Sequence, residues 1–475
     1  MAARGGPAGA LVPAGGGGSG AGGGGSAAAG GPGGGGAAAP APRVARVGAG
    51  AVPPEVAEDP ALLAALEALP ANYALEVPKA VWRCRRDGVR RVALQFPEGL
   101  LLFACAIADI LREHAGVRDA VVLGDVTYGA CCVEDLQARA LGCDLLIHYG
   151  HSCLVPVPRS AVPCMYVFVD IQVDAAHLEA TFRQHFPPGA RVAVAGVVQF
   201  NASVQKLKAS VAGDYALDVP QSKPLSVGEV LGCTAPRLPG AAGCCSSSSG
   251  AGGGCGGQGG DEADGWDGIF FVADGRFHLE AMMIANPGVP AFRYDPYSRE
   301  LTRERYDHQG MRAARRAAIE RAREARHWGV VLGTLGRQGN PALLRRIEAR
   351  LQERGIAHTV VLLAEVTLER LALFEGVDAW VQICCPRLSI DWGEGFGGVP
   401  LLTPYEAFCA LGAATPFFAE GAPDGGAYPM DYYSAEPGGD WGSTYMKRRK
   451  PRAARAGGGE VSGSASVLAR DRVPA

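Results

Sequence analysis

Short apolar runs with the length of buried strands alternate along the chain with stretches that have the spacing of amphipathic helices. The runs that begin at Arg91, Arg191 and Gly329 each open one such series, and further apolar runs follow each of them. Strands that alternate with helical stretches are typical of βαβ units and parallel sheets. The pattern therefore predicts an α/β fold of three similar domains, each with a small, mainly parallel sheet flanked by helices.

Three segments of the 475-residue chain are poor in large apolar side chains and lie outside these domains. The N-terminal segment is so rich in Gly and Ala that burial cannot offset its ordering entropy. The predicted division is a disordered tail over 1–52, domains over 71–180, 186–310 and 327–445, a Gly/Ser/Cys-rich insert at 240–265, and a basic, then Gly/Ser-rich disordered tail over 446–475. Helices are expected at 100–113, 203–211, 278–285 and 341–354, and a charged connecting helix at 312–326.

Charge and hydropathy argue against several classes of partner. The net charge of −3 gives no general affinity for polyanions, so we expect no DNA partner. No apolar run reaches the roughly 18 residues of a transmembrane helix, and Met1–Gly36 lacks the apolar segment of a signal peptide.

Fourteen cysteines without such a signal predict a reducing compartment, for which we expect the cytoplasm. The basic run Lys447–Lys450 is either a nuclear localisation signal or, as we favour, a solvated basic stretch.

The common local motifs for metals and phosphates are missing from the sequence. No C-x-x-C pair occurs, which disfavours a structural zinc protein and a thioredoxin-like redox site. The cysteine triplet of the common radical enzymes and the P-loop motif are absent as well. Gly333–Gly339 follows a predicted strand and gives a weak phosphate signal, but a tight turn is the favoured interpretation.

Each predicted domain instead carries one turn that contains cysteine. These turns hold the pair Cys131–Cys132, the single Cys233 and the pair Cys384–Cys385, and they lie at strand ends or in Gly-rich stretches. Ligands of α/β sheets gather at such strand ends. Three thiolates from three domains could therefore meet at an iron–sulfur cluster with one open iron. From spacing alone, buried core cysteines remain the stronger alternative.

Five ordered motifs carry a resemblance to a known family. They are QFPEGL at 95–100, GDVTYGACCVED at 124–135, LGCDLLIHYGHSCL at 141–154, GEVLGC at 228–233 and CCPRLSID at 384–391. Together they resemble the diphthamide synthesis radical enzyme family over about 71–445, and within it the eukaryotic type. The resemblance implies three similar domains arranged around a central 4Fe–4S cluster, with Cys131, Cys233 and Cys385 as its ligands.

The resemblance also implies an activity and its partners. The enzyme would be a transferase, a 2-(3-amino-3-carboxypropyl)histidine synthase. It would move the 3-amino-3-carboxypropyl group of S-adenosylmethionine to C2 of a histidine in translation elongation factor 2. This radical reaction is the first step of diphthamide biosynthesis. Implied partners are a paralogous subunit 2 in a heterodimer and a small iron-binding electron donor.

The sequence leaves two other functions open. One is the paralogous accessory subunit of the same heterodimer, which resembles a chain without the middle cysteine, so Cys233 argues against it. The other is a non-catalytic three-domain binding module with incidental cysteines.

Four further residues are candidates for binding S-adenosylmethionine. Gln95 and Glu98 lie at the first strand-to-helix turn, although Glu98 could simply serve the helix N-terminus. His151, like His148, ends a strand and either lines the site or is a structural histidine. Arg387 either holds the methionine carboxylate or forms an interface salt bridge.

The remaining cysteines are not expected to bind metal. Within the two adjacent pairs we expect Cys132 and Cys384 to pack into the protein, since neighbouring side chains point in different directions. The others assigned no ligand role are Cys143, Cys153 and Cys164 in the first domain, and Cys244, Cys245 and Cys255 in the insert.

Overall fold

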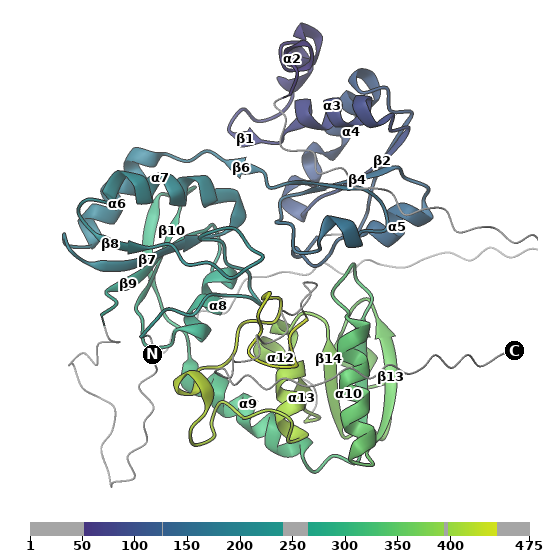
Figure 1. The fold of residues 1–475 in the computed structure, drawn as a ribbon, viewed down its shortest axis with the longest axis vertical. Coiled ribbons are helices and arrows are strands. Elements are labelled where there is room, and N and C mark those ends of the chain that lie inside the picture. Colours follow the sequence, from purple (N-terminus) through teal and green to yellow (C-terminus); the bar gives the residue numbers. More distant parts are fainter. Residues whose placement is uncertain (1–51, 126, 241–264, 394–397, 444–475) are drawn as a thin grey trace, which may run out of the picture. The chain divides into compact units, whose positions relative to one another are not determined.

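The computed structural model describes residues 52–125, 127–240, 265–393 and 398–443 (Figure 1). Nearly all of the predicted tails and insert lies outside these residues, including Cys244, Cys245, Cys255 and the run Lys447–Lys450. Within the described part of the chain, no helix combines the length and apolar character that crossing a membrane requires.

The first sheet has four parallel strands in the order β3-β2-β4-β5. Alternate residues of β2 face opposite ways, as the two-residue period of a strand requires. Val92 and Leu94 pack with α3 and α4, whereas Ala93 packs with α5, and Figure 1 shows these helices on the two sides of the sheet. The elements are α3 (Val77–Asp87), β2 (Arg91–Gln95), η1 (Glu98–Phe103), α4 (Ala104–His114), β3 (Asp119–Val122), α5 (Asp135–Ala140), β4 (Leu145–Tyr149), η2 (Val157–Arg159) and β5 (Cys164–Val167).

The second sheet has five strands in the order β11-β10-β9-β7-β8. Its edge strand β11 is antiparallel to β10 and was not expected, because its sequence ELTRE is polar and lacks the apolar run of the other strands. The Asp295 carboxylate accepts bonds from Tyr297 N and Ser298 N and closes the hairpin. The elements are α6 (Ala175–His185), β7 (Arg191–Gly196), η3 (Val198–Phe200), α7 (Asn201–Val211), β8 (Ala216–Asp218), β9 (Gly268–Val272), α8 (Phe277–Ala285), β10 (Ala291–Asp295) and β11 (Glu300–Glu304).

The third sheet is parallel throughout, in the order β13-β12-β14-β15. Val330 faces α10 and a core shared with the second sheet, and Val331 faces α11. Helix α9 begins earlier than predicted because the Asp307 side chain caps it by accepting from Gly310 N. The elements are α9 (His308–Ala322), β12 (His327–Gly333), α10 (Pro341–Glu353), β13 (Ala357–Leu363), α11 (Leu368–Leu371), β14 (Ala379–Ile383), α12 (Arg387–Trp392), β15 (Leu401–Leu402), α13 (Pro404–Ala410) and η5 (Pro423–Gly426).

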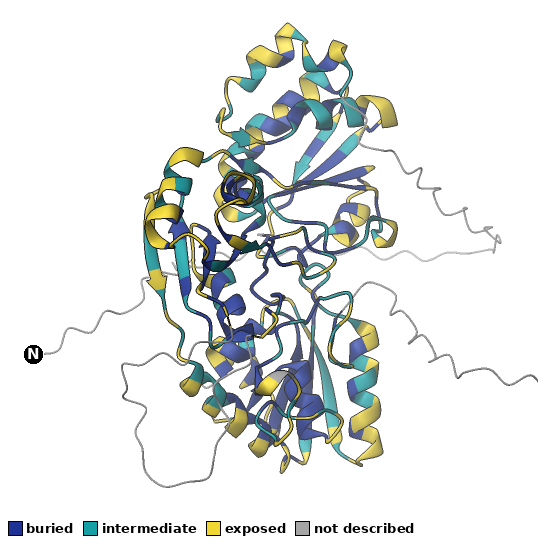
Figure 2. Ribbon diagram, turned by 60° about the vertical axis from the view of Figure 1, so that its left-hand side comes forward, coloured by how far each residue is buried: buried dark blue, intermediate teal, exposed yellow. Residues whose placement is uncertain are grey.

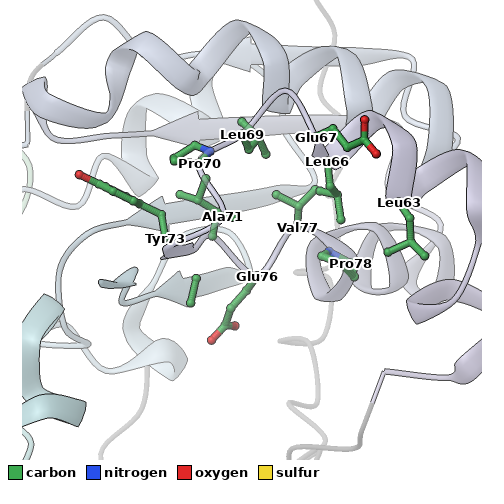
Figure 3. Close-up of a pocket in the computed structure, with 12 residues that line it drawn as sticks. Leu63, Leu66, Glu67, Leu69, Pro70, Ala71, Tyr73, Glu76, Val77 and Pro78 are labelled. Carbon is green, nitrogen blue, oxygen red and sulfur yellow. The ribbon is translucent and has the colours of Figure 1, made fainter. Parts of the chain in front are cut away.

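A small N-terminal layer lies beside the first sheet. It consists of α1 (Pro54–Ala57), α2 (Pro60–Leu66) and the two-stranded sheet of β1 (Tyr73–Ala74) and β6 (Asp170–Ile171). Leu66, Tyr73 and Val77 line an open groove of about 580 Å³ in this layer (Figure 3).

The predicted class, α/β with small, mainly parallel sheets flanked by helices, is confirmed. The central strands of the sheets are buried, the edge strands β8, β11 and β13 are partly exposed, and the outer faces of many flanking helices are exposed (Figure 2). The described residues form a single compact unit, so the boundaries of the three domains stay a prediction.

A buried ion pair ties α9 to the third sheet. Arg315 and Glu406 are both fully buried, with Nε to Oε1 at 2.7 Å and Nη2 to Oε2 at 2.8 Å. Arg315 also donates to Ser389 O in α12 at 2.6 Å and to Leu401 O at 2.7 Å. Its guanidinium therefore fixes the helix that follows Cys385.

We expect Arg315→Met to lower the free energy of unfolding by about 3–5 kcal/mol, because it leaves the Glu406 carboxylate buried without its cation. The adjacent Arg316 is an internal control, since its side chain is exposed and it pairs with Glu320 on the surface. Arg316→Met should cost at most about 1 kcal/mol. Chemical denaturation of the two variants checks this difference, and equal losses would contradict it.

Candidate metal centre

The first cysteine turn (residues 129–133) is held from within the first sheet by Gln95. The buried Gln95 side chain donates from Nε2 to Cys132 O at 2.6 Å. Its Oε1 accepts from Glu134 N at 3.2 Å and lies 2.9 Å from His148 Nδ1. Gln95 therefore fixes the backbone of the turn on both sides of Val133.

The turn is held from the other side by residues 333–339, the loop after β12 in the third sheet. Arg337 N donates to Cys131 O at 2.8 Å, and Gln338 Nε2 donates to Cys132 Sγ at 3.3 Å. Gly336 has a φ of +52°, and a Cβ there would lie 2.6 Å from the Cys132 backbone. The favoured interpretation of this loop as a turn fits these contacts, but its role in holding a cysteine was missed.

An ion pair reinforces this junction between the first and third sheets. The Arg337 guanidinium binds the buried Asp135 carboxylate through two bonds, Nε to Oδ1 at 2.7 Å and Nη2 to Oδ2 at 2.5 Å. Asp135 begins α5, just after the first cysteine turn. A bidentate pair fixes orientation as well as distance.

The second cysteine turn (residues 231–234) is closed by a bridge between Leu231 and Thr234. The C-terminal segment crosses it, because Ala235 N donates to Met430 O at 2.8 Å and Tyr433 N donates to Thr234 Oγ1 at 3.1 Å. A Cβ on Gly232 would lie 2.1 Å from the ring of Phe277. A larger residue beside Cys233 would therefore have to displace the Phe277 ring.

The third cysteine turn (residues 384–386) follows β14. As at Gln95, a glutamine side chain holds the backbone of the turn. Gln382 accepts from Cys384 N at 2.8 Å and donates to Cys385 O at 2.9 Å. Cys384 packs in an apolar cluster with Val331 and Trp380, as expected for a core cysteine. Cys385 is more exposed, and Pro386 after it caps α12.

The three turns bring their thiols into electrostatic range of one another. The Cys131 thiol is affected by its neighbour Cys132, by Cys233 and by Cys385, and its pKa is raised well above the usual value. Burial raises the pKa of Cys233, with a further contribution from Cys385, and burial raises that of Cys385 to about 11. Cys132 also lies in this range, since it contributes to the pKa of Cys385.

The donor set distinguishes between kinds of metal centre. Within the described ranges, no three His, Cys, Asp or Glu side chains gather closely enough to bind one metal ion. An iron–sulfur cluster makes a different demand, because each of its thiolates binds a different iron. Thiols that are neighbours without meeting at a single point fit such a cluster.

Arg387 supplies positive charge beside these thiols, and lowers the pKa of both Cys233 and Cys385 against the larger effect of burial. The hydrogen bonds of the Arg387 guanidinium all go to other groups of the protein. Nε lies 2.9 Å from both Asp391 oxygens, Nη1 donates to Phe277 O at 2.7 Å, and Nη2 pairs with Glu280. These contacts favour the interface salt bridge over a site for the methionine carboxylate.

The other candidate residues fall into two groups. Glu98 is exposed at the start of η1, consistent with its alternative as a helix N-terminal residue. His148 and His151 are neighbours, with ring centroids 5.9 Å apart. Burial lowers the pKa of His148 to about 3 and that of His151 to about 4, so both are neutral near pH 7.

Cys143 and Cys164 pack in the apolar core beside α5, and Cys153 is partly buried.

The fold and site define a class of protein: an α/β chain that gathers one cysteine turn from each of three small sheets. The sequence model of diphthamide synthesis proteins matches residues 96–417. The chain therefore belongs to the diphthamide synthesis protein family.

Curated relatives and solved structures agree with this assignment. The chain is 49% identical over 409 residues to 2-(3-amino-3-carboxypropyl)histidine synthase subunit 1 of Gallus gallus, covering 86% of this chain and 92% of that one. It is 47% identical over 417 residues to the protein of the same name in Homo sapiens, covering 87% and 86%. A crystal structure of Dph2 from Pyrococcus horikoshii matches with a TM-score of 0.56 at 25% identity, covering 75% of this chain and 96% of that one. A second crystal structure of that protein, with a 4Fe-4S cluster, matches with a TM-score of 0.57 at 24% identity, covering 79% and 96%.

We expect Gly336→Ala to reduce the iron bound per chain, because a methyl group there would push the 333–339 loop away from Cys132. Gly355 is the matched control, since it also has a positive φ (+66°) but nothing lies within 4 Å of its missing Cβ. Each alanine pays a similar backbone strain of about 1 kcal/mol. Iron analysis after anaerobic reconstitution separates the two variants, and equal iron in both would show that the contact with Cys132 is dispensable.

Proposed function

We propose that this chain is the catalytic subunit of the synthase that carries out the first step of diphthamide biosynthesis. It is a transferase that moves the 3-amino-3-carboxypropyl group of S-adenosylmethionine to C2 of a histidine in translation elongation factor 2. The single observation that carries the proposal is the gathering of Cys131, Cys233 and Cys385 from three sheets. Curated relatives that bear the synthase name, at 47–50% identity, support it.

Three similar α/β domains surround a central 4Fe–4S cluster in this proposal, and Cys131, Cys233 and Cys385 hold it. The cluster of the Pyrococcus horikoshii protein supports this arrangement. When bound, the cluster supplies the electron that cleaves a C–S bond of S-adenosylmethionine. The chain's own residues keep the three thiols in place, and the burial of the turns keeps water away from the reacting group.

Of the four residues predicted to bind S-adenosylmethionine, His151 is the one we retain as a direct contact, because it lines a cavity. Gln95 and Arg387 use their donors on the protein, so we assign them to holding the first cysteine turn and to the charge beside the thiols. Glu98 is exposed and carries no contact role in this proposal.

The proposed partners follow from the chemistry and from the names of the relatives. The name subunit 1 supports a heterodimer with a paralogous subunit 2. Elongation factor 2 supplies the target histidine, and a small iron-binding protein supplies electrons. Cys233 supports the catalytic rather than the accessory subunit. The cytoplasm stays the predicted location.

The experiment that tests this function is anaerobic turnover with the partner subunit, a reductant, S-adenosylmethionine and purified elongation factor 2. Cleavage of the bond to the transferred group should release 5′-methylthioadenosine, with one modified histidine per molecule released. Dominant release of 5′-deoxyadenosine would contradict the proposed reaction, because it would mean that a different C–S bond of S-adenosylmethionine breaks.

Serine variants of the paired cysteines test the ligand assignment. Cys131→Ser, Cys233→Ser and Cys385→Ser should each lose most of the bound iron and activity, because a thiolate ligand is removed. Cys132→Ser and Cys384→Ser are the matched neighbours and should keep much of both. Iron content and turnover measured together check this, and the reverse pattern within either pair would overturn the assignment for that pair.

A further inference from the structure

A small, partly open cavity of about 120 Å³ lies beside the second cysteine turn, and the proposed function has so far used only its His151. It is formed where β2, β4 and β7 end, and its lining includes Pro97, His151, Ser152, Val198, Glu229 and His278. Leu231 of the second cysteine turn also lines it. The cavity therefore lies at the carboxyl ends of strands from two sheets, where ligands of α/β folds bind.

Glu229 is the fully buried carboxylate of this cavity. Its Oε2 accepts from Ser226 N at 3.0 Å, but Oε1 accepts no hydrogen bond from any residue that the structure describes. Burial raises the pKa of Glu229, and the neighbouring Ser152 hydroxyl and Ser226 lower it by less, so the charged form still needs a cationic partner to be stable there. A backbone bridge to Gly196 fixes Glu229 in place.

Two more hydrogen-bonding atoms in the cavity are unused by the described residues. They are His151 Nδ1 and Ser152 Oγ, and both are buried. The low pKa of His151 keeps its ring neutral, so Nδ1 is an acceptor when the proton is on Nε2. His278, whose pKa burial lowers to about 3, adds a second neutral ring and no positive charge. The cavity therefore offers one carboxylate oxygen and two neutral acceptors to a ligand.

Three acceptors around one small cavity match the three N–H donors of a primary ammonium. A volume of about 120 Å³ is large enough to admit a small charged end group. We propose that Glu229, with His151 and Ser152, binds the α-ammonium of the 3-amino-3-carboxypropyl group of S-adenosylmethionine. This proposal rests on the proposed function and names the part of the chain that recognises the transferred group.

Such a contact would also orient the reaction. The carbon released from sulfur lies two bonds from the carbon that carries the ammonium. Anchoring the ammonium beside the second cysteine turn therefore limits where the released carbon can lie relative to Cys233. Glu229 acts as a binding and positioning residue in this account.

The test measures binding of S-adenosylmethionine to the anaerobically reconstituted heterodimer with Glu229→Gln. A second ligand, the deamino analogue in which hydrogen replaces the ammonium, isolates the contact. Glu229→Gln should weaken binding of S-adenosylmethionine about 10- to 100-fold, as expected for a hydrogen bond to a charged group, and leave the deamino analogue unchanged. Glu300→Gln, at an exposed carboxylate in β11, is the control and should change neither affinity.

Ser152→Ala tests the same site by a milder change, in case the Glu229→Gln heterodimer fails to bind iron. It should weaken binding of S-adenosylmethionine by about 3- to 10-fold, again without effect on the deamino analogue. Unchanged affinity in both variants, or an equal loss for both ligands, would overturn the ammonium site. A variant whose only change is a raised KM for elongation factor 2 would also overturn it, because the cavity would then take the target imidazole.

These outcomes are distinct from a failure of the proposed function. If wild-type heterodimer bound no S-adenosylmethionine and released no 5′-methylthioadenosine, the proposed function itself would fail. If wild type bound and cleaved S-adenosylmethionine while the variants behaved like wild type, only the ammonium site would be lost.

Discussion

The structure depends on keeping three thiols close together although their negative forms repel one another. Cys131, Cys233 and Cys385 come from three different sheets, and burial makes each of them harder to ionise. No single sheet can provide the geometry, so contacts between the sheets must fix it. Many of those contacts are hydrogen bonds to the backbone of the cysteine turns. They position each thiol and leave its sulfur available to bind iron.

The same solution occurs at two strand ends. Gln95 and Gln382 each place a side-chain amide on the carbonyl of a cysteine, at 2.6 Å and 2.9 Å. Glycines then allow neighbouring segments to approach, at Gly336 against Cys132 and at Gly232 against Phe277. Arg387 adds the compensating charge, and its bonds to Asp391 and Glu280 hold it near the thiols. Positioning and electrostatics thus come from residues that do not themselves bind metal.

Much of the fold could be predicted from the sequence, because apolar runs in parallel strands are a local signal. The strands predicted from Arg91 and Arg191 begin at those residues, and the strand predicted from Gly329 begins two residues earlier, at His327. The polar strand β11 could not be found this way, since its partner strand rather than its own sequence makes it a strand. The cysteine turns were found, but the contact of Gln338 with Cys132 joins residues 206 positions apart and leaves no local trace. Glu229 lay within a recognised motif, yet only its burial and unpaired oxygen give it a role.

The most direct test of the account is to locate the iron in crystals of the anaerobically prepared heterodimer by anomalous scattering at the iron absorption edge. The account predicts one compact four-iron peak in this chain, bonded to the sulfurs of Cys131, Cys233 and Cys385 and to no other protein atom. Iron bonded to Cys132 or Cys384 instead, or a peak away from the three cysteine turns, would contradict it.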